Sequence, residues 1–167
     1  MRKITAIIFA ACAAFALGAC NKEQQAANPE AEAKPQVAPV PKTADKTAWK
    51  QYLVSVVTAN MQGVKTNHPY MYFVPAGDDD ATKADRQNQL DNVKNVVARG
   101  VLPGNMMAFG GPDSKTTADL IVASFAEVGA GSFKDVIVLF IGAPGDVDEV
   151  RQALTSSGAE VRFVEAK

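Results

Sequence analysis

Apolar residues from position 47 onward follow two periods, one typical of helices and one typical of strands. The helical period predicts an amphipathic helix over residues 48–64 and three further helices, whose apolar stripes lie within residues 90–97, 120–128 and 147–154. Short apolar runs between them predict strands at residues 70–74, 106–109, 135–141 and 160–165. The predicted order is therefore α-β-α-β-α-β-α-β.

Two of the predicted strands indicate how the sheet is built. Residues 135–141 are apolar on both faces, which is typical of a central parallel strand covered by helices. Residues 160–165 alternate polar and apolar side chains and predict an edge strand, which could pair with a strand of another protein. Alternating helices and strands favour right-handed crossovers and a parallel sheet. We predict a small three-layer α/β/α sandwich, flavodoxin-like or Rossmann-like. Its four-stranded, mainly parallel sheet has the order 2-1-3-4, with two helices on each face.

The chain begins with a different pattern. Basic residues at positions 2 and 3 precede an apolar run at residues 4–17, which is typical of a secretory signal peptide. At roughly 14 residues the run is too short to span a ~30 Å hydrocarbon core. Its end, Leu17-Gly18-Ala19-Cys20, resembles the lipobox of bacterial lipoproteins. The alternative is a buried helix with an ordinary core cysteine.

The lipobox resemblance implies cleavage between Ala19 and Cys20 and a lipid anchor, including palmitate-type acyl chains, on Cys20. Two or more acyl chains hold a soluble domain stably on a bilayer. In Gram-negative lipoproteins, an Asp directly after the lipidated cysteine commonly retains the protein in the inner membrane. Here that position is Asn21, so the resemblance implies an outer-membrane anchor facing the periplasm. In a Gram-positive source the protein would instead lie on the outer face of the single membrane. Cys12 would leave with the signal peptide.

Residues 21–46 are rich in Ala, Gln, Glu, Lys and Pro and lack periodic apolar positions. Their four prolines exclude a long helix and favour an extended spacer. A docking motif within this segment is the alternative. The sequence thus predicts a signal peptide at residues 1–19, the lipidated cysteine and a linker at residues 20–46, and an α/β domain at residues 47–167.

Composition narrows the class of function. Hydrophobic residues make up 47% of the 167 residues, which excludes a fully disordered chain. The net charge of −1 gives no general electrostatic case for nucleic-acid binding. The one histidine, His68, precedes the first strand, whereas the Ser and Asp candidates follow strands, so no Ser-His-Asp set is predicted. No G-x-G-x-x-G follows a strand, and we predict no cofactor.

Polar side chains gather in three loops that follow predicted strands. In open α/β sheets, ligands bind at the carboxyl ends of the strands, near the switch in strand order. The loops at residues 77–80, 110–116 and 142–146 therefore supply the candidates for ligand or partner binding, which are Asp78, Asp79, Asp80, Asp113, Ser114, Lys115 and Asp146.

Three explanations compete for these loop residues. The acidic run at residues 78–80 could gather Ca²⁺ or Mg²⁺, but its spacing differs from the calcium-loop pattern. Residues 110–116 superficially resemble a phosphate loop but lack its G-K-[ST] ending. Helix capping alone would also place Asp and Ser directly before helices. We favour capping and predict no metal site.

These observations predict a non-catalytic, membrane-anchored module of the cell envelope that binds a periplasmic protein partner. The alternative is a tethered enzyme or a metal-dependent ligand binder that uses the acidic loops. The two hypotheses differ in whether the residues of those loops bind a ligand or only stabilise the fold.

Overall fold

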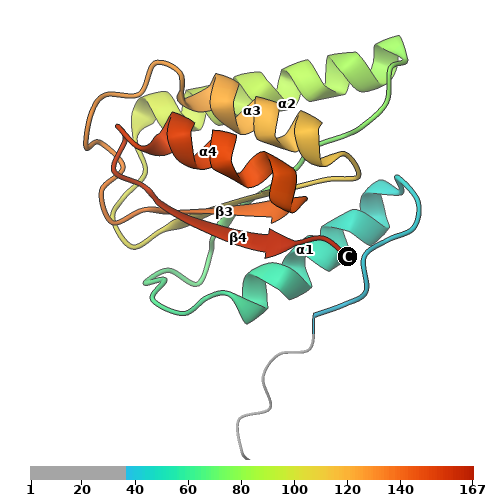
Figure 1. Ribbon diagram of the computed structural model, residues 1–167, viewed down its shortest axis with the longest axis horizontal. Helices are drawn as coiled ribbons and strands as arrows, with labels where there is room; N and C mark the ends of the chain where they lie inside the picture. The colour runs from blue at the N-terminus through green and yellow to red at the C-terminus, as the bar shows by residue number, and fades with distance from the viewer. Residues whose placement is uncertain (1–36) are drawn as a thin grey trace, which may run out of the picture. The chain divides into compact units, whose positions relative to one another are not determined.

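The computed structural model describes residues 37–167, and the predicted signal peptide and lipidated cysteine lie outside that range. Helices and strands alternate as predicted (Figure 1). In chain order the elements are α1 (Lys46–Ala59), β1 (Tyr70–Phe73), α2 (Asp80–Arg99), β2 (Met106–Gly110), α3 (Ser114–Phe125), β3 (Ile137–Gly142), a short 3-10 turn (Pro144–Asp146), α4 (Val147–Leu154) and β4 (Glu160–Glu165).

The four strands form one parallel sheet, which confirms the predicted fold class. The predicted strand order of 2-1-3-4 is wrong, because the strands follow one another as β1-β2-β3-β4. β4 is an edge strand as predicted. β1 is the second edge, where the sequence had placed an interior strand.

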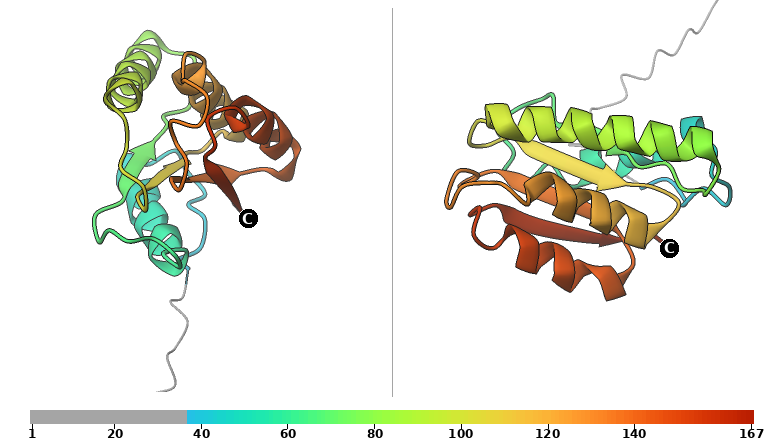
Figure 2. Two further views of the ribbon diagram at one scale, coloured as in Figure 1. Left: turned by 90° about the vertical axis from the view of Figure 1, so that its left-hand side faces the viewer. Right: turned by 90° about the horizontal axis from the view of Figure 1, so that it is seen from above.

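The distribution of helices follows from this order. Right-handed crossovers between successive neighbouring strands return the chain to the same face each time. Consequently α2, α3 and α4 lie on one face, and α1 alone lies on the other (Figures 1 and 2). The predicted arrangement of two helices on each face is therefore also wrong.

Each face of the sheet has its own apolar core. Strand side chains alternate between the faces, so Tyr72 and Phe109 pack under the three helices, whereas Phe73 and Ala108 pack against α1. β3 is buried on both faces throughout, as its sequence predicted. The helix α1 contributes mainly Trp49, Tyr52, Leu53, Val56 and Val57.

The folded part begins before residue 47. The Ala38 amide donates a hydrogen bond to Ser55 Oγ at 3.0 Å, and Trp49 Nε1 donates to the Thr43 carbonyl at 3.0 Å. Val40 packs against the α1 core. Residues 38–45, which the sequence assigned to the linker, therefore lie along the domain. At its other end α1 stops at Ala59, earlier than the predicted residue 64.

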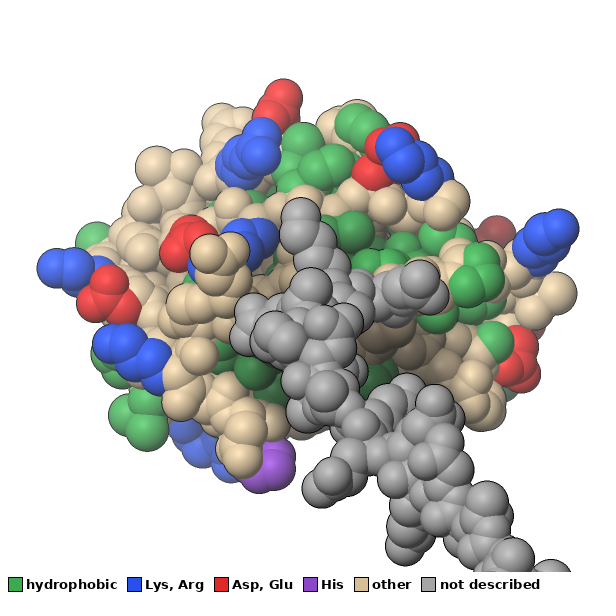
Figure 3. Space-filling model, turned by 90° about the horizontal axis from the view of Figure 1, so that it is seen from below, with side chains coloured by type: hydrophobic (Ala, Val, Ile, Leu, Met, Phe, Trp, Pro, Cys, Tyr) green, Lys and Arg blue, Asp and Glu red, His purple; other side chains and the backbone are tan. Residues whose placement is uncertain are grey.

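Charge is spread over the α1 face of the domain. Basic and acidic side chains alternate there with apolar ones, and neither sign of charge forms a large patch (Figure 3). This distribution fits the near-neutral composition. A chain with so little net charge does not generate a strong long-range electrostatic field.

Candidate functional site

The three predicted loops lie at the carboxyl ends of β1, β2 and β3, as expected for a parallel sheet. The premise that a ligand would bind at a switch in strand order fails, however. A sheet whose order runs from β1 to β4 without reversal has no such switch point. The loops must therefore be judged by their own contacts.

Two of the candidate aspartates cap helices. Asp79 Oδ1 accepts a hydrogen bond from the Thr82 amide at 2.9 Å at the start of α2. Asp113 Oδ1 accepts one from the Thr116 amide at 2.6 Å at the start of α3. Hydrogen bonds from Thr82 and Thr116, respectively, lower the pKa of the two carboxyls. These contacts are the capping that the sequence favoured.

Ser114 and Asp146, which were also predicted to cap helices, form a hydrogen bond with each other instead. Ser114 is the first residue of α3 and does not cap it, because Asp113 does. Asp146 makes no capping hydrogen bond to α4, so the capping prediction is wrong for this residue. Ser114 Oγ donates to Asp146 Oδ2 at 2.5 Å and accepts from the Ala143 amide at 2.6 Å. The pair joins the start of α3 to the loop after β3.

Lys115 also joins two helices. Its ammonium pairs with Asp119 one turn along α3 and with Glu149 of α4 at 3.2 Å. These two carboxylates raise the pKa of Lys115. Asp78 and Asp80 are exposed beside the Asp79 cap. Within residues 37–167, no group of three or more His, Cys, Asp or Glu side chains is arranged to hold a metal ion.

Arg86 also lies at this edge, and the sequence did not predict it as a site residue. Arg86 projects from α2 and donates from Nη1 to the carbonyls of Pro75 at 3.1 Å and Gly77 at 3.2 Å. It thereby holds the loop between β1 and α2. An arginine on a polar helix face looks like an ordinary solvated residue, so the sequence offered no signal for this role.

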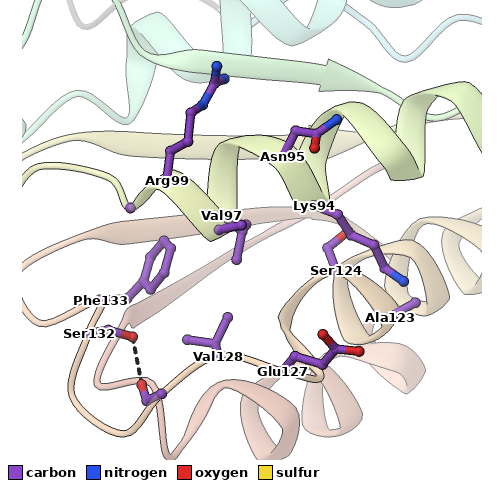
Figure 4. A pocket seen from close by; sticks show the side chains of 13 residues that line it. Lys94, Asn95, Val97, Arg99, Ala123, Ser124, Glu127, Val128, Ser132 and Phe133 are labelled. Carbon is purple, nitrogen blue, oxygen red and sulfur yellow. Dashed lines mark hydrogen bonds between the residues drawn. The ribbon is translucent and has the colours of Figure 1, made fainter.

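Two cavities lie away from the predicted loops. One, of about 600 Å³, lies between the C-terminal halves of α2 and α3, and Val97, Val128 and Phe133 form its apolar wall (Figure 4). Figure 4 also shows Ser132 bound to the Gly129 carbonyl across its rim. The other cavity, about 370 Å³, runs beside β1 between α1 and α2, and we call it the β1 groove.

The β1 strand carries an unusual polar group. The Tyr72 hydroxyl is buried and has no hydrogen-bond partner among the described residues. Burial, followed by the neighbouring Tyr70, raises the pKa of Tyr72 to about 12, although Arg99 acts in the opposite direction. His68, just before this strand, is exposed.

No family model, curated protein or solved structure matches this chain. In the described part of the chain, none of the helices is both long enough and apolar enough to cross a bilayer. The function of this protein must therefore be inferred from its own residues.

Proposed function

We propose that this protein is an envelope lipoprotein, in which acyl chains on Cys20 hold a non-catalytic α/β module that binds a protein partner. The observation that carries the proposal is Leu17-Gly18-Ala19-Cys20, placed directly after a basic start and a short apolar run. Each of these features has its expected place relative to the others. The abrupt change to a Pro- and Ala-rich composition after Cys20 supports the same interpretation.

The charge of the mature chain fits anchoring by lipid. Without Arg2 and Lys3, the remaining 15 basic residues face 18 acidic ones, a net charge of −3. A slightly acidic chain has little electrostatic attraction to anionic lipid headgroups. Acyl chains contribute ~0.8 kcal/mol for each buried CH₂, so they would supply the affinity for the membrane.

The contacts of the loop residues favour the protein-binding module over a tethered enzyme or a metal-dependent ligand binder that uses the acidic loops. Asp79 and Asp113 already accept backbone amides, and Asp146 accepts the Ser114 hydroxyl. A carboxylate that caps a helix would lose that hydrogen bond on turning toward a ligand, at a cost of ~0.5–2 kcal/mol. These residues therefore stabilise the fold at the carboxyl edge of the sheet, and their carboxylates are not free to bind a ligand there.

Metabolic labelling with radioactive palmitate tests the anchor. The wild-type chain should incorporate label and have the intact mass of a protein that begins at an acylated Cys20. Cys20→Ser should abolish both labelling and cleavage after Ala19. Cys12→Ser is the matched control, since it removes a thiol from the same leader, and it should change neither result. A free thiol on Cys20 in the wild type would overturn the proposal.

Sorting provides a separate test of location. We propose that Asn21 directs the anchored protein to the outer membrane of a Gram-negative cell. Asn21→Asp should move it to the inner-membrane fraction, whereas Asn21→Gln should leave it in the outer membrane. If Asn21→Asp stayed in the outer membrane, the assignment of this residue would be wrong, but the lipid anchor would be unaffected.

A further inference from the structure

We propose that the exposed edge of β1 binds an extended, acidic segment of a partner protein as an additional strand of the sheet. This inference rests on the proposed function, because it names the class of partner that the module binds. It places the interaction at the first strand, whereas the sequence had pointed to the last strand, residues 160–165.

The backbone of β1 offers free hydrogen-bonding groups on its outer side. The Val74 amide donates to the Gly110 carbonyl at 2.9 Å, so it faces β2. Main-chain groups alternate between the two sides of a strand, which turns those of Met71 and Phe73 toward the open edge. β1 is the last strand of the sheet on that side, so within residues 37–167 no strand pairs with it there.

The β1 groove has walls that could receive the side chains of an added strand. Figure 2 shows the β1 edge between α1 and α2. Met71, Tyr72 and Phe73 line the groove, which holds about 370 Å³. On the α1 side the groove is lined by two lysines, Lys46 and Lys50. On the α2 side it is lined by one carboxylate and three amide side chains, which are Asp85, Asn88, Gln89 and Asn92. Alternate side chains of a bound segment would meet these two walls in turn.

The charge of the α1 wall selects an acidic occupant. Lys50 makes no ion pair with any residue between 37 and 167, and Lys46 lies 3.8 Å from Asp85 with both side chains more than 60% exposed. Such an exposed pair contributes little to stability, so an incoming carboxylate can replace Asp85. Carboxylates on the α1 side of the added strand would pair with both lysines.

The same charges disfavour a second copy of this chain. Two β1 strands that paired antiparallel around a twofold axis would extend the sheet and place the two α1 helices on the same face. Lys46 and Lys50 of both copies would then lie on one side of the junction. Like charges at a junction cost stability, whereas an acidic segment removes this repulsion.

The two edges of the sheet differ in how well they accept another strand. On β4, Arg162 Nε pairs with Glu160 at 2.7 Å, and charged side chains on an edge strand discourage pairing. β1 instead exposes Tyr70 and Met71, at 40% and 44%. Large apolar side chains beside free backbone groups are typical of an edge that accepts a strand.

A pair of synthetic peptides tests the inference on the purified protein in the form that cells produce. The probe is fluorescein-labelled Thr-Glu-Thr-Val-Thr-Glu-Thr, and its control has Lys in place of both Glu residues. Anisotropy at low salt should show binding of the acidic peptide only, because exposed charges are screened at high salt. Peptide binding should shift the NMR signals of the Met71 and Phe73 amides.

Variants separate the roles of charge and backbone. Lys46→Glu with Lys50→Glu should weaken binding by about tenfold or more. Lys94→Glu with Lys134→Glu, an equal charge change away from the groove, should not. Met71→Pro removes an outward amide and should abolish binding, whereas Met71→Thr keeps that amide and should bind. If circular dichroism showed Met71→Pro to be unfolded, the charge variants would still decide.

Several results would overturn the inference. They are equal binding of both peptides, amide shifts at β4 in place of β1, no binding at millimolar peptide, and dimerisation of the chain through β1. The intact mass of the same preparation reports the anchor independently. Lost binding with a lipidated Cys20 would overturn only the β1 inference, whereas binding by a chain without lipid would overturn only the proposed anchor.

Discussion

Arg162 Nη1 of β4 donates a hydrogen bond to the Asn60 carbonyl at the end of α1, at 3.1 Å, across 102 positions of the sequence. The same nitrogen donates to the Gln62 carbonyl at 2.6 Å. A guanidinium at a helix C-terminus satisfies carbonyls that have no partner within the helix and complements the helix dipole. The last strand thus holds the one described helix that covers its face of the sheet.

Replacement of Arg162 should weaken the attachment of α1 to the sheet and so destabilise the domain. Arg162→Ala removes the charge-assisted hydrogen bonds to Asn60 and Gln62, and also the ion pair with Glu160, from a side chain that is only 25% exposed. It should lower the free energy of unfolding by about 1–2 kcal/mol. Arg151→Ala, which removes an exposed pair with Asp148, should change it by less than about 0.5 kcal/mol. Urea denaturation measures both, and equal effects would contradict the role given to Arg162.

Gly111 has no room for a side chain. A Cβ atom there would lie 2.0 Å from the Val74 carbonyl oxygen. Val74 directly follows β1 and Gly111 directly follows β2, so the two backbone segments approach each other closely at this point. Gly111→Ala should therefore cost at least about 2 kcal/mol of stability, because backbone must move. Gly145→Ala meets nothing within 4 Å and should have little effect. Thermal unfolding compares the two, and a stable Gly111→Ala protein would contradict the close approach.

The Ser114–Asp146 pair should show energetic coupling. Ser114→Ala removes the hydrogen bonds to both Asp146 and the Ala143 amide and should destabilise the domain by about 1–2 kcal/mol. A double-mutant cycle with Asp146→Ala should give a coupling energy of about 1 kcal/mol. Additive effects would show that the two side chains act independently.

Asp113 should make stability depend on acidic pH. Its hydrogen bonds with Thr116 hold its pKa below the ordinary value of 3.8 in the folded chain. The unfolded chain therefore takes up the proton first, so this contribution is complete above that value and is lost as the pH falls through the lower, folded pKa. Asp113→Asn keeps an acceptor oxygen and should flatten the dependence. Urea denaturation at a series of pH values compares this variant with the wild type.

The buried hydroxyl of Tyr72 should destabilise the folded state. Tyr72→Phe removes a polar group without a hydrogen-bond partner and should raise the free energy of unfolding by about 1 kcal/mol. Tyr70→Phe, on an exposed ring, should leave it within about 0.5 kcal/mol.

Alkaline pH gives a second test at the same residue. The folded pKa of Tyr72 of about 12 exceeds its ordinary value of 10.0, so its contribution to stability falls as the pH rises above 10.0. Tyr72→Phe should remove that alkaline component. An unchanged profile, or a less stable Tyr72→Phe protein, would indicate that the hydroxyl has a partner in solution.

The candidate loops show where prediction from sequence stops. The caps of Asp79 and Asp113 are local, because each acceptor lies three residues from its donor, and they were predicted. Ser114 and Asp146 are 32 positions apart, and their contact exists only because β2 and β3 are neighbours. Arg86 likewise reaches back to a loop whose position depends on the sheet.

The sequence by itself determined the alternation of helices and strands and the interior place of the strand predicted at residues 135–141. These follow from periodicity and from the chemistry of neighbouring residues. Only the tertiary structure decided the strand order, the lone position of α1 and the open edge of β1. Strand order depends on which apolar faces meet across long separations in the chain, and several orders satisfy the same local pattern.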